Sequence, residues 1–172
     1  MKNVLYYKKR IIAGIIIIVI IGIIIFGVTN KQSSNNGPAI IDGIECNSME
    51  QAVFHIHAHL DIIINGQQHP IPAQIGILDN KCLYWLHTHD QSGIIHIEAP
   101  QQQTFTVGQF IDIWNSTQNI MLQYGAPRIF VNGQEVYTKL SDTVLNAHDE
   151  VVIVYGTMPH NIPWYYEFPP GL

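Results

Sequence analysis

Positive charge is scarce in the part of the chain that follows residue 31. The 172-residue sequence carries eight Lys and Arg residues against thirteen Asp and Glu residues. Half of the basic residues lie within the first ten positions, and from residue 31 onward four basic residues face all thirteen acidic ones, a formal charge of −9. Domains that bind nucleic acid or anionic lipid present basic surfaces. The composition therefore argues against a nucleic-acid partner and is compatible with a cation as the ligand.

Familiar catalytic motifs are also missing. The sequence has no His-Glu-x-x-His, no Gly-x-Ser-x-Gly, no phosphate-binding loop and no dinucleotide-binding fingerprint. Ser92 lies near His89, but its place in an Asp-Gln-Ser-Gly stretch is typical of a turn residue. Whether the protein is an enzyme stays open at this point.

Cysteine is limited to Cys46 and Cys82. In an oxidising compartment a disulfide is the default, and closing its loop of about 36 residues would contribute roughly 3–4 kcal/mol. The alternative is a thiolate copper ligand, which would need a weak axial Met nearby. Because no Met follows Cys82 closely, we expect the disulfide.

A long apolar run occupies residues 11–28, directly after Lys2, Lys8, Lys9 and Arg10. It covers roughly 27 Å as a helix, close to the thickness of a bilayer core, and no typical cleavage site follows it. We expect a transmembrane anchor rather than a cleaved signal peptide, with residues 1–10 cytoplasmic and the remainder outside the cell. Residues 29–37 form a linker, 38–158 one extracytoplasmic domain and 159–172 a Pro- and aromatic-rich tail, expected to strap across the sheet or to dock a partner.

The domain alternates strand patterns with one helical segment. Strands with turn residues between them are predicted at 54–64 and 67–71, at 83–89 and 94–98, at 128–131 and 134–137, and at 150–155. A capping box at Thr106 and Gln109 introduces a short helix over 107–115. We therefore predict an α+β fold, a mainly antiparallel sheet with one packed helix. The helix, hairpin and final strand resemble the β-grasp arrangement of ubiquitin-like sulfur carriers.

Seven of the nine histidines fall between residues 55 and 96. His55, His57 and His59 share one face of a predicted strand, and so do His87 and His89 of another. A turn centred on residues 91–92 sets His96 opposite His87. Imidazoles placed in this way can converge on one metal ion at about 2.0–2.1 Å each. The alternative, that they are ordinary exposed or core histidines, must place several imidazoles side by side without a partner.

Two carboxylates complete the candidate metal site, Asp90 in the turn and Glu98 on the strand of His96. His69 faces the wrong side in the simplest register, and His148 and His160 are expected in solvent. Imidazole ligands suit copper or zinc, and the oxygen-only pattern of a calcium site is absent. We slightly favour copper for an outward-facing nitrogen site. If all six histidines take part, two ions could bind, with three ligands from the segment of His55, His57 and His59 and three from that of His87, His89 and His96.

The stretches Phe-His-Ile-His-Ala-His-Leu at 54–60 and Trp-Leu-His-Thr-His-Asp-Gln-Ser-Gly-Ile-Ile-His-Ile-Glu at 85–98 resemble a family of secreted or membrane-anchored proteins from ammonia-oxidising archaea and several bacterial groups. The likeness continues through residues 75–77, Cys82 and 105–114. It implies one outward-facing domain and brings no activity with it. The sequence thus predicts a metal-binding protein in metal handling or in association with a membrane complex, with a metalloenzyme as the alternative.

Overall fold

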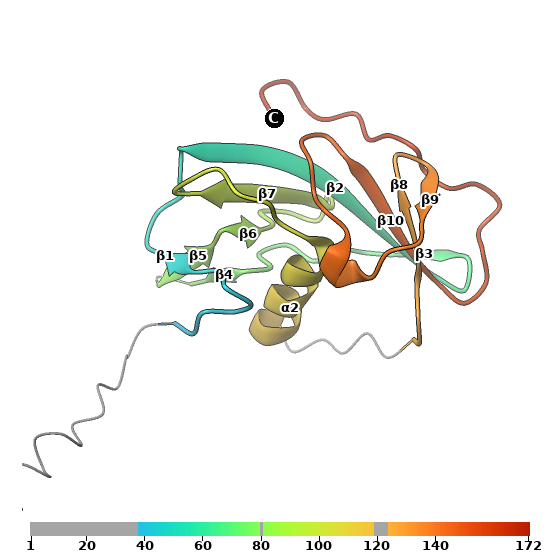
Figure 1. The fold of residues 1–172 in the computed structure, drawn as a ribbon, viewed down its shortest axis with the longest axis horizontal. Helices are drawn as coiled ribbons and strands as arrows, with labels where there is room; N and C mark the ends of the chain where they lie inside the picture. Colours follow the sequence, from blue (N-terminus) through green and yellow to red (C-terminus); the bar gives the residue numbers. More distant parts are fainter. Residues whose placement is uncertain (1–37, 80, 119–123) are drawn as a thin grey trace, which may run out of the picture. The chain divides into compact units, whose positions relative to one another are not determined.

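A mixed, mainly antiparallel sheet with one helix packed against it makes up the described part of the chain (Figure 1). The structure is a computed structural model and describes residues 38–79, 81–118 and 124–172. The strands are β1 (Cys46–Asn47), β2 (Phe54–Ile64), β3 (Gln67–His69), β4 (Ile77–Leu78), β5 (Cys82–Tyr84), β6 (Leu86–His87), β7 (Ile94–Ala99), β8 (Arg128–Val131), β9 (Gln134–Val136) and β10 (Glu150–Tyr155). The helices are α2 (Val107–Gln118) and the 3-10 turn η1 (Leu140–Asp142). The predicted α+β class is confirmed.

The main sheet has the strand order β6-β7-β2-β10-β8-β9, with β3 also paired to β2. All neighbours run antiparallel except β2 and β10, which are parallel and lie at its centre. A second, small sheet has the order β1-β5-β4. The parallel pair joins segments about ninety residues apart, a contact that no local pattern in the sequence announces.

Strand β2 owes its two faces to its alternating sequence. Ala58, Leu60 and Ile62 are fully buried on the face that also receives the apolar side chains of α2, among them Phe110 and Ile113. Polar side chains alternate with them and project from the opposite face of the sheet. Figure 1 shows α2 on one side of the sheet and the C-terminal segment running along the other.

The helix begins where the sequence places it. The Gln109 backbone N–H donates to Thr106 Oγ1 at 3.3 Å, and the Thr106 N–H donates to Gln109 Oε1 at 3.0 Å, so the predicted capping box forms. The helix ends at Gln118, one turn later than predicted. Thr117 stabilises this extra turn because its hydroxyl donates to the Ile113 carbonyl at 2.8 Å.

The predicted strand over residues 83–89 is divided in two. Strand β5 pairs within the small sheet, where the disulfide between Cys46 and Cys82 joins it to β1. Strand β6 turns to the main sheet and pairs with β7. The bend lies at Trp85, whose carbonyl still accepts a hydrogen bond from the Glu98 N–H at 2.8 Å. The predicted disulfide is confirmed.

The outer face of the sheet, opposite α2, has two halves of different character. Histidine and glutamate side chains occupy the half formed by β6, β7 and the start of β2. A small apolar cluster of Ile63, Phe130, Val152 and Val154 occupies the other half, and Met158 and Ile162 pack on it. The C-terminal segment therefore covers the apolar half of this face.

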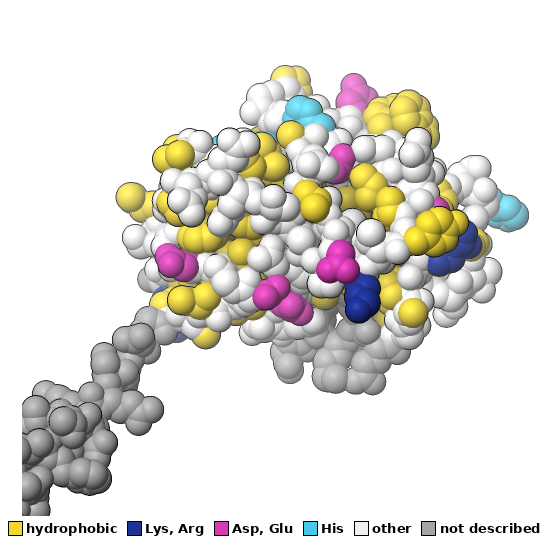
Figure 2. All heavy atoms as spheres, viewed as in Figure 1, with side chains coloured by type: hydrophobic (Ala, Val, Ile, Leu, Met, Phe, Trp, Pro, Cys, Tyr) yellow, Lys and Arg dark blue, Asp and Glu magenta, His cyan; other side chains and the backbone are white. Residues whose placement is uncertain are grey.

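Charged side chains are sparse on the surface in the orientation of Figure 2, and basic ones especially so. Residues 38–79, 81–118 and 124–172 contain no helix with the length and apolar character of a membrane span. The predicted anchor at residues 11–28 and the linker at 29–37 lie outside the described residues.

Candidate metal centre

Three histidines stand in one row across three neighbouring strands. Antiparallel pairing sets His87 of β6 directly opposite His96 of β7, and His96 directly opposite His57 of β2. Residues paired in this way project from the same face, so the three imidazoles meet on the outer side of the sheet. The predicted pairing of His87 with His96 is confirmed, and the alignment of both with His57 comes from the tertiary structure.

Three further side chains join this row. His55 of β2 lies opposite Glu98 of β7, two residues along each strand from the pair of His57 and His96. His89 follows His87 beyond the end of β6. We call the six residues the histidine cluster: His55, His57, His87, His89, His96 and Glu98. All six were predicted from the sequence as metal ligands.

The nitrogen atoms in the cluster face one another at short range. His57 Nε2 lies 3.0 Å from His55 Nε2 and 3.2 Å from His96 Nδ1. His87 Nε2 lies 3.3 Å from His89 Nε2. Two ligands of a tetrahedral ion, each bound at 2.0–2.1 Å, are about 3.3 Å apart. The spacing in the cluster is therefore that of neighbouring ligands on one ion.

Glu98 lies among the imidazoles and is buried, with 2% of its surface exposed. Its Oε1 atom lies 3.2 Å from His55 Nε2, 3.6 Å from His96 Nδ1 and 4.0 Å from His87 Nε2. Its Oε2 atom is buried without a hydrogen-bond partner among the described residues. Burial alone would raise the pKa of Glu98, but the His96 hydrogen bond and the charges of His87 and His55 outweigh it and lower the pKa. A buried carboxylate oxygen of this kind favours a cation beside it.

His87 is oriented by the backbone. Its Nδ1 lies 2.9 Å from the Tyr84 carbonyl, which can only accept, so Nδ1 carries the proton and Nε2 presents its lone pair to the cluster. Histidines that bind metals are commonly held in this way. Burial lowers the pKa of His87 to about 4. At neutral pH the ring is therefore neutral, the form that binds a metal.

His57 is also held in the neutral form. Burial, followed by the positive charges that His96 and His55 can carry, lowers its pKa to about 4. Two side chains of the cluster reach solvent, because His55 and His89 are 44% and 42% exposed. Glu50 Oε1 lies 3.6 Å from His89 Nε2. No pattern in the sequence pointed to Glu50, because its approach to His89 depends on the tertiary structure.

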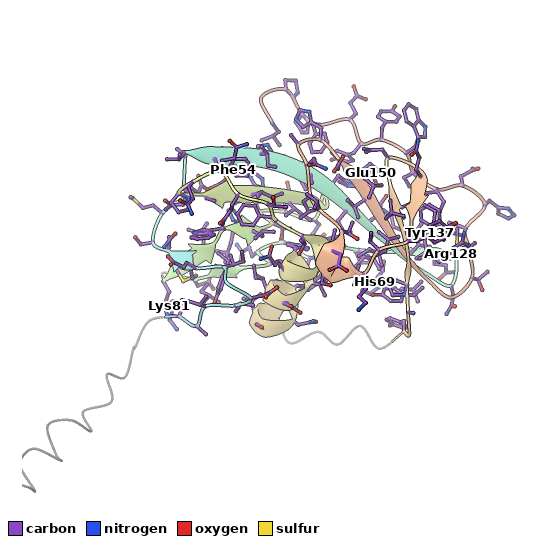
Figure 3. All side chains as sticks on the ribbon, viewed as in Figure 1. Phe54, His69, Lys81, Arg128, Tyr137 and Glu150 are labelled. Atoms are coloured by element: carbon purple, nitrogen blue, oxygen red, sulfur yellow. A yellow bond between two sulfur atoms is a disulfide. The ribbon has the colours of Figure 1, made fainter. Side chains whose placement is uncertain are left out.

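His59 lies on the same face as the cluster but is engaged elsewhere. Its Nε2–H donates to the Ser92 carbonyl at 2.8 Å, and its Nδ1 lies 2.7 Å from Glu150 Oε2 at the start of β10. The Tyr166 ring stacks on it with centroids 3.8 Å apart and planes 8° apart. Figure 3 shows Glu150 on β10 below the C-terminal segment. Glu150 was not predicted as a site residue, because only the parallel pairing of β10 with β2 brings it to His59.

Contact with Glu150 favours the charged form of His59. Burial opposes a charge on His59, but the hydrogen bond and negative charge of Glu150 outweigh it and raise the pKa of His59. Burial raises the pKa of Glu150. Asp61 forms a group of three with His59 and Glu150. Its Oδ1 accepts a hydrogen bond from Gln68 Nε2.

Asp90 and the three histidines that were not predicted as ligands lie outside these groups. Asp90 is exposed and accepts a hydrogen bond from the Ser92 N–H at 2.9 Å, so it stabilises the turn before β7. His69 pairs opposite Ile62, towards the other end of β2 from Phe54 (Figure 3). His148 contacts the Leu172 carbonyl and is exposed, as is His160.

Three groups of described side chains could hold a metal ion, each with ligand atoms within 4.8 Å of one another. Two share His96 and together form the histidine cluster: His87, His89, His96 and Glu98, and His55, His57 and His96. The third is His59, Asp61 and Glu150. Fold and side chains thus define an α+β domain with a potential metal-binding face. No family model, curated protein or solved structure matches the chain.

Proposed function

We propose that this chain is a membrane-anchored, extracytoplasmic protein that binds copper or zinc through the histidine cluster. It would serve in metal handling or as an accessory to a membrane complex. The observation that carries the proposal is the convergence of five imidazoles and one buried carboxylate from three neighbouring strands.

Hydrogen bonding within the cluster alone leaves its polar atoms poorly satisfied. His57 Nε2 faces a nitrogen of His55 and one of His96, yet a neutral ring nitrogen either donates one proton or accepts one. Protonating the rings to supply more donors would place several positive charges side by side. A bound metal ion satisfies these lone pairs together and also the free oxygen of Glu98.

The ligand types support both metals. Imidazoles with one carboxylate, as in the group of His87, His89, His96 and Glu98, suit zinc. The all-nitrogen group of His55, His57 and His96 suits copper, which binds such sites more tightly than zinc does.

Two features support the outward location. The apolar run at residues 11–28 follows a basic N-terminal segment, and the disulfide between Cys46 and Cys82 is of a kind that persists in oxidising compartments. For the fold we propose a β-grasp-like domain. The order β7-β2-β10-β8, with β2 and β10 parallel at the centre and α2 between them in sequence, supports that likeness.

A metalloenzyme is the second candidate, and the solvent exposure of His55 and His89 favours it. A catalytic metal ion keeps a coordination position for water or oxygen, whereas a closed shell only binds. Azide binding to the copper-loaded protein distinguishes the two, because a new azide-to-copper absorption band reports an open position. No band at saturating azide would favour metal handling.

Metal content of the purified full-length chain, loaded with copper or zinc and then dialysed, tests the proposal. The variant His87→Asn removes the Nε2 ligand but keeps a side-chain N–H for the Tyr84 carbonyl. We expect stoichiometric metal in the wild type and at least a tenfold weaker affinity in His87→Asn. The exposed His160→Ala is the matched control and should bind as the wild type does. A wild-type chain that retains neither metal would contradict the proposal.

A further inference from the structure

We infer that the histidine cluster holds two metal ions, bridged by the carboxylate of Glu98. The inference rests on the proposed metal-binding function and adds a second site to it. It starts from a count of ligands, because five imidazoles and one carboxylate exceed the four positions that zinc takes in most protein sites.

The first site lies at β2. His55 Nε2, His57 Nε2 and His96 Nδ1 form a chain of contacts of 3.0 and 3.2 Å with His57 in the middle. Glu98 Oε1 lies 3.2 Å from the His55 nitrogen and 3.6 Å from the His96 nitrogen. His55, His57 and His96 thus bring three nitrogens together, and Glu98 lies beside two of them as the carboxylate that this site would share with the second.

The second site lies at β6. His87 and His89 bring their Nε2 atoms within 3.3 Å of each other, and the Tyr84 carbonyl keeps the His87 lone pair turned towards the cluster. The Glu98 carboxylate is the nearest anionic group to His87, with Oε1 at 4.0 Å. This site has two nitrogens and one oxygen, and His89 is exposed, so it retains a coordination position open to solvent.

Glu98 is placed to bridge the two. Its Oε1 lies 3.2 Å from the His55 nitrogen of the first set and 4.0 Å from the His87 nitrogen of the second, while its Oε2 is buried and has no hydrogen-bond partner among the described residues. A carboxylate that gives one oxygen to each of two ions uses both atoms, and ions in two-metal sites are about 3.5–4 Å apart. The bridge therefore explains an oxygen that a single ion at β2 would leave without a partner.

The group of His59, Asp61 and Glu150 is a weaker place for the second ion. His59 Nδ1 already lies at hydrogen-bond distance from Glu150, and Tyr166 covers the ring. That group also serves as the alternative location in the test.

The test counts bound ions in the full-length chain, with Cu(II) and with Zn(II) in separate titrations. The variants are His55→Ala in the first site and His89→Ala in the second, both at exposed positions where folding is little affected. The control is the exposed His69→Ala. We expect two equivalents in the wild type and the control, and one in each variant.

Electron paramagnetic resonance of the Cu(II)-loaded protein adds a readout of distance. Two copper ions about 4 Å apart give a spin-coupled spectrum, whereas each variant should show the spectrum of one isolated copper ion. Glu98→Gln, which preserves the size of the side chain, should abolish the spin coupling and weaken binding of the second ion at least tenfold. Two coupled ions in Glu98→Gln would overturn the bridging role.

The remaining outcomes separate the inference from the proposed function. If the wild type binds one equivalent of metal and both His55→Ala and His89→Ala lose it, the cluster holds one shared ion. The inference then fails and the proposed function stands. Two uncoupled equivalents, one of them lost only in Glu150→Gln, would place the second ion at His59 and overturn the inference. No bound metal in the wild type would overturn both.

Discussion

Two histidines on the outer face of the sheet have pKa values shifted in opposite directions by their surroundings. His87 and His59 each donate one ring N–H to a backbone carbonyl, of Tyr84 and of Ser92. The second nitrogen of His87 faces other imidazoles, and burial holds its pKa at about 4. The second nitrogen of His59 faces Glu150, whose charge raises the pKa of His59. One ring is therefore prepared for a metal ion and the other for a proton.

Replacing Glu150 with Gln tests this difference at the level of one residue. Without the negative charge, burial dominates, so the pKa of His59 should fall. The folded protein should lose about 1–3 kcal/mol of stability near pH 6, because a charge-assisted hydrogen bond is lost. Titration of the His59 ring by NMR measures the pKa, and thermal unfolding measures the stability.

Glu135→Gln is the matched control for this prediction. It removes a carboxylate from the surface pair with Arg128, which lies away from His59 and is largely exposed. The control should leave the His59 titration unchanged. An unchanged pKa of His59 in Glu150→Gln as well would show that the contact does not set its charge.

At the level of elements, the turn between β6 and β7 fixes how the two strands present their histidines. Gly93 ends this turn with φ of +86°, a conformation that side chains rarely adopt. A Cβ atom at Gly93 would lie 2.7 Å from the Leu60 carbonyl oxygen and 2.8 Å from His59 Nε2. The backbone of the turn and the His59 ring are therefore packed too closely for any side chain here.

Gly93→Ala should destabilise the chain by about 3 kcal/mol, from the strained φ and the displaced neighbours together. Gly43→Ala is the matched control, since Gly43 has a φ of +78° but no neighbouring atom within 4 Å of a Cβ. The control should lose only about 1 kcal/mol, from backbone strain alone. Thermal unfolding of both metal-free variants measures the difference, and equal losses would show that the close packing at Gly93 is not the cause.

At the scale of the whole molecule, the metal-free chain should become more stable as the pH rises from 4 to 6.5. His57 and His87 have pKa values of about 4 when folded and ordinary values near 6.5 when unfolded. The unfolded chain therefore binds more protons in this range, and stability rises with pH. The raised pKa values of His59 and Glu150 act in the opposite sense, adding stability at low pH that fades as the pH rises.

His87→Asn isolates one contribution, because the other groups titrate in both proteins. The variant should flatten the rise between pH 4 and 6.5 by up to about 3 kcal/mol, the equivalent of the shift at His87. Thermal unfolding in the presence of a chelator, at half-unit steps of pH, measures it. The same slope in both proteins would contradict the assignment of a low pKa to His87.

Local patterns in the sequence determined most of the elements and the main candidate site. The alternation in residues 54–64 gave β2 and both its faces, Thr106 and Gln109 gave the start of α2, and the turn at 91–92 gave the pairing of His87 with His96. These features depend on residues close in the chain, where side-chain periodicity and turn chemistry act directly. The pairing of Cys46 with Cys82 was expected because they are the two cysteines of the chain and no Met closely follows Cys82 to complete a copper site.

Only the tertiary structure decided how the elements share the outer face. The parallel pairing of β10 with β2 brings Glu150 to His59 and so separates that ring from the histidine cluster. The row of His57, His96 and His87, and the buried place of Glu98 among them, depend on which strands become neighbours. Strand order is fixed by burial summed over the whole core rather than by any local pattern, so the sequence alone identified the members of the histidine cluster but not their arrangement.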